Sequence, residues 1–81
     1  MISICQIKAA RALLGWSAIQ LSNESGVGSA TIKRYESQDG LPQGNFQKVM
    51  KIKETFEAAG IEFIGDPLTN PGVILHKHAG K

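Results

Sequence analysis

The feature that most constrains this chain is WSAIQLSNESGVGSATIKRYE, residues 16–36, where two short helical patterns are separated by Ser-Gly-Val-Gly. Gly26 predicts the end of the first helix, expected over residues 18–25, because glycine readily adopts the left-handed conformation that closes many helices. The second helix is expected over residues 28–37, with one of its first two residues as N-cap. So short a connection fixes the angle between the two helices, and the rest of the fold has to pack around that pair.

The chain has 81 residues, 42% hydrophobic and 20% charged, which is enough to close one hydrophobic core but not two. Its single cysteine, Cys5, has no partner for a disulfide or a cysteine-rich zinc site, and we expect it to be a small buried apolar residue. No apolar run reaches the roughly 18 residues of a membrane span. These features favour a one-domain cytoplasmic protein.

Apolar residues at helical spacing predict two further helices, one on each side of this pair. The first is expected over residues 4–14, with an apolar stripe that includes Leu13 and Leu14. Gly15 is a typical helix C-cap, and Ser17 is a typical N-cap for the helix that follows.

The other flanking helix is expected over residues 46–59, after a Gly- and Pro-rich turn. Asn45 is its predicted N-cap, and Gly60 ends it. Its expected apolar face comprises Phe46, Val49, Met50, Ile52, Phe56 and Ala59.

After residue 60 the period changes from helical to extended. IEFIG at 61–65 and GVILH at 72–76, separated by the turn formers DPLTNP, predict a β-hairpin. An isolated hairpin is marginal in water, and both faces of this one carry apolar residues, so we expect it to pack on the helices and to pair with a second copy. The expected fold is mainly α, with four to five short helices in residues 1–60 and, in the same domain, a dimerisation hairpin in residues 61–81.

Charge is unevenly distributed along the chain. Residues 1–53 carry seven basic and three acidic side chains, whereas the remainder is net acidic. The basic part suits a polyanion, although charges of both signs that merely solvate the surface are the open alternative.

The two-helix pattern has the proportions of a helix-turn-helix, and its residues resemble the Cro/C1 (XRE) type of DNA-binding domain. The resemblance spans about residues 4–60, and the tail is similar to the ending of many short bacterial regulators. The residues that match the family pattern are Arg11, Gly15, Trp16, Ser17, Leu21, Ser25, Gly26, Val27, Thr31, Ile32, Tyr35 and Glu36. The resemblance implies a lambda-repressor-like bundle that binds double-stranded DNA as a homodimer, without a cofactor.

The resemblance also implies that the helix at 28–37 enters the major groove. The family's groove-facing positions correspond here to Ser29, Ala30, Thr31, Lys33 and Arg34. Arg34 is the candidate for a base contact, since a guanidinium can donate to O6 and N7 of guanine together; contact with phosphate or solvent is the alternative. Lys33 and Ser29 are candidates for phosphate.

Further contacts are expected at the starts of helices. Ser17, Gly28 and Asn45 are candidates to lie against phosphates, because helix N-termini attract anions. Arg11 and Glu36 correspond to an ion pair that, in the family, joins the first helix to the end of the recognition helix. Their expected role is structural.

Three positions depart from the family pattern. Ala18 replaces a glutamine that often reaches DNA, Ser22 replaces a packing alanine, and Gly28 replaces a Ser or Thr cap. Two alternatives to a transcriptional repressor therefore stay open. One is a helix-turn-helix scaffold without specific DNA binding, and the other is an antitoxin or protein-interaction module whose hairpin binds a toxin or another protein.

The remaining chemistry-bearing residues favour structural roles. Trp16 is expected in the core rather than stacked on a nucleotide. His76 and His78 are too few for a metal site, so no metal is expected. No catalytic motif such as a nucleophile elbow, a phosphate-binding loop or a zinc-binding His-Glu-x-x-His is present, so we expect no enzyme.

Overall fold

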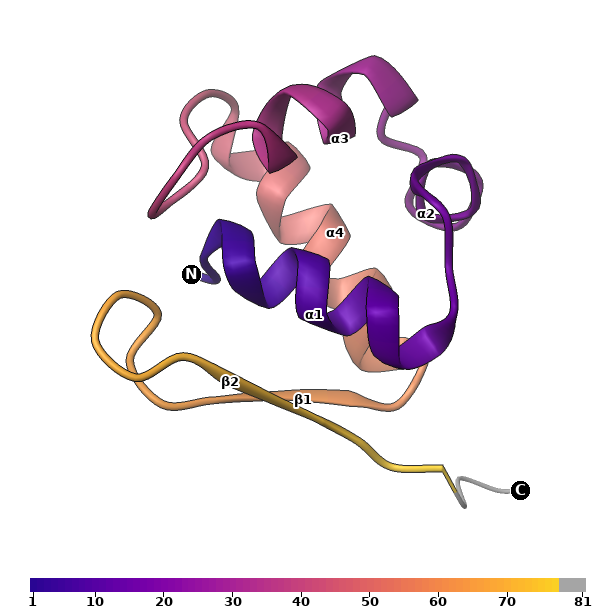
Figure 1. Ribbon diagram of the computed structural model, residues 1–81. Coiled ribbons are helices and arrows are strands. Elements are labelled where there is room, and N and C mark those ends of the chain that lie inside the picture. Colours follow the sequence, from indigo (N-terminus) through magenta and orange to yellow (C-terminus); the bar gives the residue numbers. More distant parts are fainter. Residues whose placement is uncertain (78–81) are drawn as a thin grey trace.

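A computed structural model describes residues 1–77, so residues 78–81 of the predicted tail, including His78, lie outside the described part. Four helices are followed by an antiparallel two-stranded hairpin, as predicted. The elements are α1 (Ile4–Leu14), α2 (Ala18–Ser25), α3 (Ser29–Glu36), α4 (Phe46–Ala58), β1 (Ile61–Ile64) and β2 (Gly72–Leu75). Figure 1 shows α1 between the hairpin and α3, with α4 crossing behind α1.

The helix boundaries follow from the capping residues. Gly15 and Gly26 close α1 and α2 in the left-handed conformation, with φ of 69° and 78°. The hydroxyl of Ser17 accepts the amide of Gln20 at 3.0 Å and so caps α2. Asn45 caps α4 through Oδ1, which accepts the amide of Gln47 at 2.8 Å. These predicted caps are confirmed.

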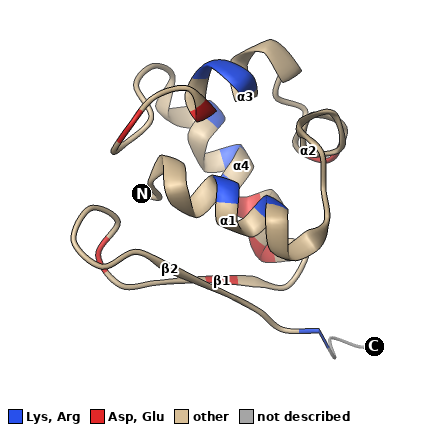
Figure 2. Cartoon of the chain, viewed as in Figure 1, with Lys and Arg blue, Asp and Glu red and all other residues tan. Residues whose placement is uncertain are grey.

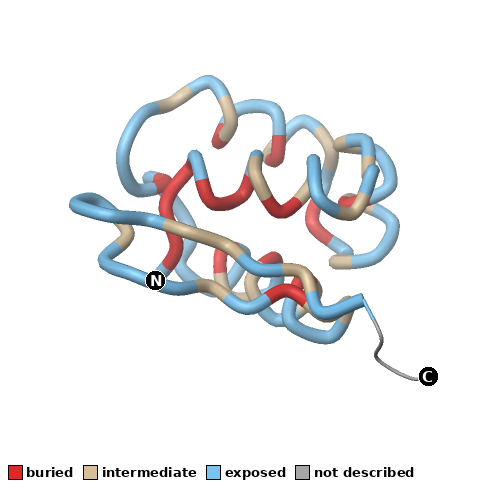
Figure 3. Tube along the Cα trace, turned by 60° about the horizontal axis from the view of Figure 1, so that its bottom comes forward, coloured by how far each residue is buried: buried red, intermediate tan, exposed pale blue. Residues whose placement is uncertain are grey.

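One hydrophobic core is shared by the four helices and the first strand. Its buried members are Ile2, Ile4, Ile7, Ala10, Leu21, Val27, Ile32, Tyr35, Val49, Ile52, Phe56 and Ile61. Phe56 contacts two other aromatic rings. Its ring stacks on that of Trp16 with the centroids 5.9 Å apart, and it meets Phe63 edge-on at a centroid distance of 6.1 Å. The buried stretches line the interior between helices and hairpin, while most residues of the connecting loops are exposed (Figure 3).

The hairpin has two different faces because its side chains alternate along each strand. Ile61 lies opposite Leu75, and Phe63 lies opposite Val73, and these four side chains pack on the helices. The other face carries Glu62, Ile64 and Ile74, and the two isoleucines are each 40% exposed. The outer face is therefore mixed rather than wholly apolar, because Oε1 of Glu62 and Nε2 of His76 lie 2.8 Å apart on it, within hydrogen-bonding distance.

Gln6 attaches the hairpin to α1. Its side-chain amide donates to the carbonyls of Ile64 at 3.3 Å and Gly72 at 3.0 Å. Its Oε1 accepts a hydrogen bond from the backbone amide of Ser3 at 3.0 Å, so both the nitrogen and the oxygen of this buried side chain are hydrogen-bonded. A buried polar group is tolerated only when it is hydrogen-bonded in this way. Among residues 1–77, no buried side-chain nitrogen or oxygen lacks a partner.

The loop between the strands is organised by Asp66. Its Oδ1 accepts the amides of Leu68 and Thr69, each at 2.9 Å, in an Asx-type turn. These bonds, that from Leu68 first, lower the pKa of the Asp66 carboxyl because they favour its charged form. The stabilisation they give is present above the ordinary aspartate pKa and is lost as the pH falls through the lowered value.

Three expectations about side-chain burial are wrong. Cys5 is exposed, because it lies off the α1 stripe formed by Ile4 and Ile7. Leu13 is 45% exposed for the same reason. Phe46 is 58% exposed, because it begins α4 one turn before Val49, the first residue of that helix to enter the core.

Within residues 1–77, no helix has the length and apolar content needed to cross a membrane.

Candidate nucleic-acid interface

Helix α3 is sharply divided into a buried and an exposed side. Ile32 and Tyr35 are fully buried in the core. The exposed residues of α3 and its C-cap are Ala30, Lys33, Arg34 and Ser37, whose spacing places them on one face of the helix. This face, which we call the α3 face, therefore carries two cations and no acid.

The position of α3 is fixed by Arg11 of α1. Its Nε and Nη2 donate to the two carboxylate oxygens of Glu36 at 2.7 and 2.6 Å, a bidentate ion pair at the last residue of α3. Its Nη1 donates to the carbonyl of Trp16 at 2.8 Å. One guanidinium thus joins α1, the α1–α2 turn and α3.

This ion pair is partly shielded from water, with side chains 23% and 13% exposed. The hydrogen bond that Arg11 donates to Glu36 raises the pKa of Arg11 above its ordinary value, against a smaller opposing effect of burial. Because the pKa is raised, the stability that this shift contributes is fully present at neutral pH. It is lost only as the pH rises above the ordinary arginine range. The pair also removes the single α3 acid from the exposed surface.

Tyr35 links α3 to the start of α4. Its hydroxyl donates to the carbonyl of Asn45 at 3.5 Å, and its ring lies 3.6 Å from where a side chain at Gly44 would begin. Gly44 has φ of 129°, which favours glycine there. The guanidinium carbon of Arg34 lies 5.8 Å from the centre of the same ring, within the range of a cation–π contact. No local pattern in the sequence signals this contact between Arg34 and Tyr35.

Ser17 and Asn45 are exposed and already serve as N-caps. Each uses its side-chain oxygen as an acceptor for backbone amides, which leaves donors on both side chains: the Ser17 hydroxyl hydrogen and the Asn45 amide hydrogens. A capping role and a phosphate contact are thus compatible at both positions. Lys48, one turn into α4 from Asn45, is exposed and adds a cation that the predicted set did not include.

The start of α3 is less open than the sequence suggests. Ser29 and Thr31 are half-buried, whereas Gly28 and Ala30 are exposed. Gly28 is the N-cap of α3 and offers no side-chain bond, but the space around it is empty. The predicted residues Ser29 and Thr31 therefore flank the α3 face rather than project from it.

The charges are arranged so that the α3 face stays basic. Neither Lys33 nor Arg34 takes part in an ion pair within residues 1–77, while Arg11 and Lys53 are each neutralised by a glutamate. Figure 2 shows the basic segment of α3 at the end of the molecule remote from the hairpin. A projecting helix of this kind can approach a polyanion without interference from the hairpin.

Residues 1–77 contain no group of three or more His, Cys, Asp or Glu side chains arranged to hold an ion. His76 lies at 2.8 Å from Glu62, and its predicted neighbour His78 is not among the described residues.

Comparisons of this chain with protein-family models, with curated proteins and with solved structures yield no match.

Replacing Glu36 by Gln should lower the free energy of unfolding by about 1–3 kcal/mol, since Arg11 then keeps its charge in a partly shielded place without a charged partner. Urea unfolding at neutral pH measures this. The matched control is Glu57→Gln in the i,i+4 pair with Lys53, which should cost about 0.5 kcal/mol or less. Equal losses in the two variants would show that the Arg11–Glu36 pair does not hold α1 to α3.

Proposed function

We propose that this protein is a sequence-specific DNA-binding transcriptional regulator of the helix-turn-helix class, with α3 as its recognition helix. The observation that carries the proposal is the α3 face, on which Lys33 and Arg34 are exposed and which includes no acidic residue. The tight turn at Gly26 supports it, because it presents α3 at a fixed angle to α2. The resemblance of residues 4–60 to the XRE type gives independent support, and a lambda-repressor-like bundle is the fold we infer.

In this proposal the α3 face enters the major groove. Arg34 donates to O6 and N7 of a guanine, and the methyl group of Ala30 meets a thymine. Lys33 contacts phosphate, as do the donors left on Ser17 and Asn45. The cation–π contact with Tyr35 supports the role of Arg34, because it favours one orientation of a long side chain.

We also propose that the protein acts as a homodimer through the hairpin, residues 61–77. Ile64 and Ile74 are partly exposed on the outer hairpin face, and a second copy would cover them. Two-fold symmetry would then present two α3 helices to half-sites about 34 Å apart, one turn of DNA. Occupancy of promoter DNA by such a dimer gives a repressor.

A second function is favoured by the same outer hairpin face. If a different protein covers Ile64 and Ile74, the chain is an antitoxin or interaction module on a helix-turn-helix scaffold. Ala18, half-buried at the start of α2, supports this alternative, because it leaves that position without a polar group for DNA.

Selection from a pool of randomised duplexes, followed by titration at several salt concentrations, tests the DNA-binding proposal. Lys33→Ala should weaken all sequences alike and flatten the salt dependence by about one counterion. Arg34→Ala should remove the preference at one base position, worth about 1–3 kcal/mol. Lys51→Ala removes the same charge from an exposed site on α4, outside both the α3 face and the hairpin, and serves as control.

Two results would contradict this assignment. The absence of any bound duplex at about 50 mM salt would exclude the regulator, since the phosphate contribution is strongest at low salt. Identical effects of Lys33→Ala and Arg34→Ala on every sequence would exclude base reading by Arg34.

Dimerisation through the hairpin is tested by sedimentation of the full chain. Ile74→Lys places a charge on the outer face and should convert a dimer into a monomer, because a buried unpaired charge is costly. Ile19→Lys, at a side chain that is 60% exposed on α2, should leave the dimer intact. A monomeric parent protein, or a dimer that tolerates Ile74→Lys, would rule out this interface.

A further inference from the structure

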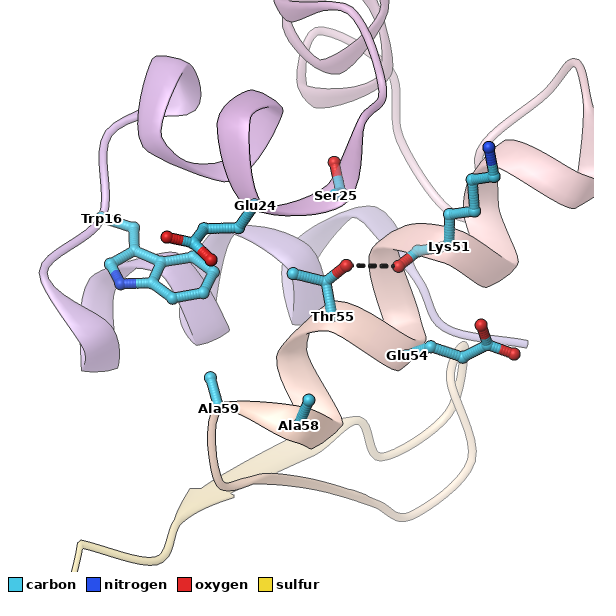
Figure 4. Close-up of a pocket in the computed structure, with 8 residues that line it drawn as sticks. All are labelled: Trp16, Glu24, Ser25, Lys51, Glu54, Thr55, Ala58 and Ala59. Atoms are coloured by element: carbon cyan, nitrogen blue, oxygen red, sulfur yellow. Dashed lines mark hydrogen bonds between the residues drawn. The ribbon is translucent and has the colours of Figure 1, made fainter.

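A hollow of about 430 Å³ opens between the α1–α2 turn, α2 and α4, and none of the predicted sites includes it. Its lining residues are Trp16, Glu24, Ser25, Lys51, Glu54, Thr55, Ala58 and Ala59 (Figure 4). The volume falls within the range of sites for small molecules. The space exists because four of the lining side chains are small.

An aromatic ring and a carboxylate both line the hollow. Trp16 is half-buried, with its ring stacked on Phe56 at 5.9 Å and held by that contact. Figure 4 shows the carboxylate of Glu24 turned toward the indole. Oε2 of Glu24 accepts a hydrogen bond from Gln20 at 2.9 Å, but within residues 1–77 no cation pairs with it.

The indole of Trp16 and the carboxylate of Glu24 both present negative potential to the hollow. The face of an indole carries negative potential, so a carboxylate beside it gains nothing from the ring. A cation placed between the two is attracted by both, by the ring through its quadrupole and by the carboxylate through its charge.

The rest of the hollow fits an uncharged body. Ala58 and Ala59 provide apolar surface, and the hydroxyl of Thr55 is already occupied as a donor to the carbonyl of Lys51 at 2.7 Å. Figure 4 shows the amine of Lys51 and the carboxylate of Glu54 pointing away from Trp16. The lysine therefore does not neutralise Glu24.

We propose that this hollow binds a small organic cation of the alkylguanidinium or alkylammonium class. The charged head lies between Trp16 and Glu24, and the alkyl body lies over Ala58 and Ala59. Because α2 and α4 form opposite walls, the bound cation stabilises their relative position. The site is separate from the α3 face and does not depend on nucleic-acid binding.

Fluorescence of Trp16 tests the site directly, since it is the single tryptophan of the chain. The probe is butylguanidinium, and its neutral analogue butylurea, which has nearly the same shape, is the matched ligand control. Saturable change of the emission with butylguanidinium but not with butylurea is expected. Amide shifts in a ¹H–¹⁵N spectrum should cluster at Ser25, Thr55, Ala58 and Ala59.

Glu24→Gln should weaken butylguanidinium binding about two- to fivefold, the contribution of an exposed ion pair. Asp39→Asn removes the same charge at an exposed position outside the hollow and should leave the affinity unchanged. Equal binding of butylurea, equal effects of the two variants, or no shifts in the hollow of the parent protein at saturating probe would each overturn the proposal.

Discussion

The guanidinium of Arg11 links three parts of the chain by hydrogen bonds. It binds both carboxylate oxygens of Glu36 and the carbonyl of Trp16, so that α1, the turn before α2 and the end of α3 share one hydrogen-bonding centre. A helix of eight residues is too short to be stable alone and takes its position from its contacts. The direction in which α3 projects therefore depends on this ion pair together with the burial of Ile32 and Tyr35.

The Arg11–Glu36 ion pair also determines which charges α3 exposes. With Glu36 turned inward, the exposed side of α3 keeps Lys33 and Arg34 and loses its acid. The hairpin packs on the side of α1 opposite to α3, where Gln6 binds it through two hydrogen bonds. The α3 face and the hairpin therefore lie at opposite ends of the molecule. A basic projecting helix at one end and a partly apolar sheet face at the other suit a protein that binds DNA at one end and a second copy at the other.

Much of this fold is predictable from the sequence because it depends on local chemistry. Glycines in the left-handed conformation at 15 and 26, and N-caps at Ser17 and Asn45, fix the ends of the helices regardless of what packs around them. The change to period two after residue 60 predicts the hairpin in the same way. The Arg11–Glu36 pair was expected only through the family resemblance, since its members are 25 positions apart.

What escaped prediction depends on contacts between distant segments. Gln6 looks like a solvent-facing polar residue, but its partners lie 58 and 66 positions away in the hairpin. Cys5 and Phe46 are apolar by type, yet no neighbouring element covers them. The hollow beside Trp16 likewise has walls from α2 and α4. Its size depends on small side chains that come from separate helices, so no local sequence pattern predicts it.

In the proposed function, DNA contacts the α3 face while the hairpin stays free of DNA. Chemical-shift mapping of the ¹⁵N-labelled protein with a selected duplex at low salt distinguishes the two surfaces. We expect the perturbed amides to cluster on α3 around Ala30 and Arg34 and at the helix starts near Ser17 and Asn45. Perturbations confined to β1 and β2, or none at saturating duplex, would contradict it.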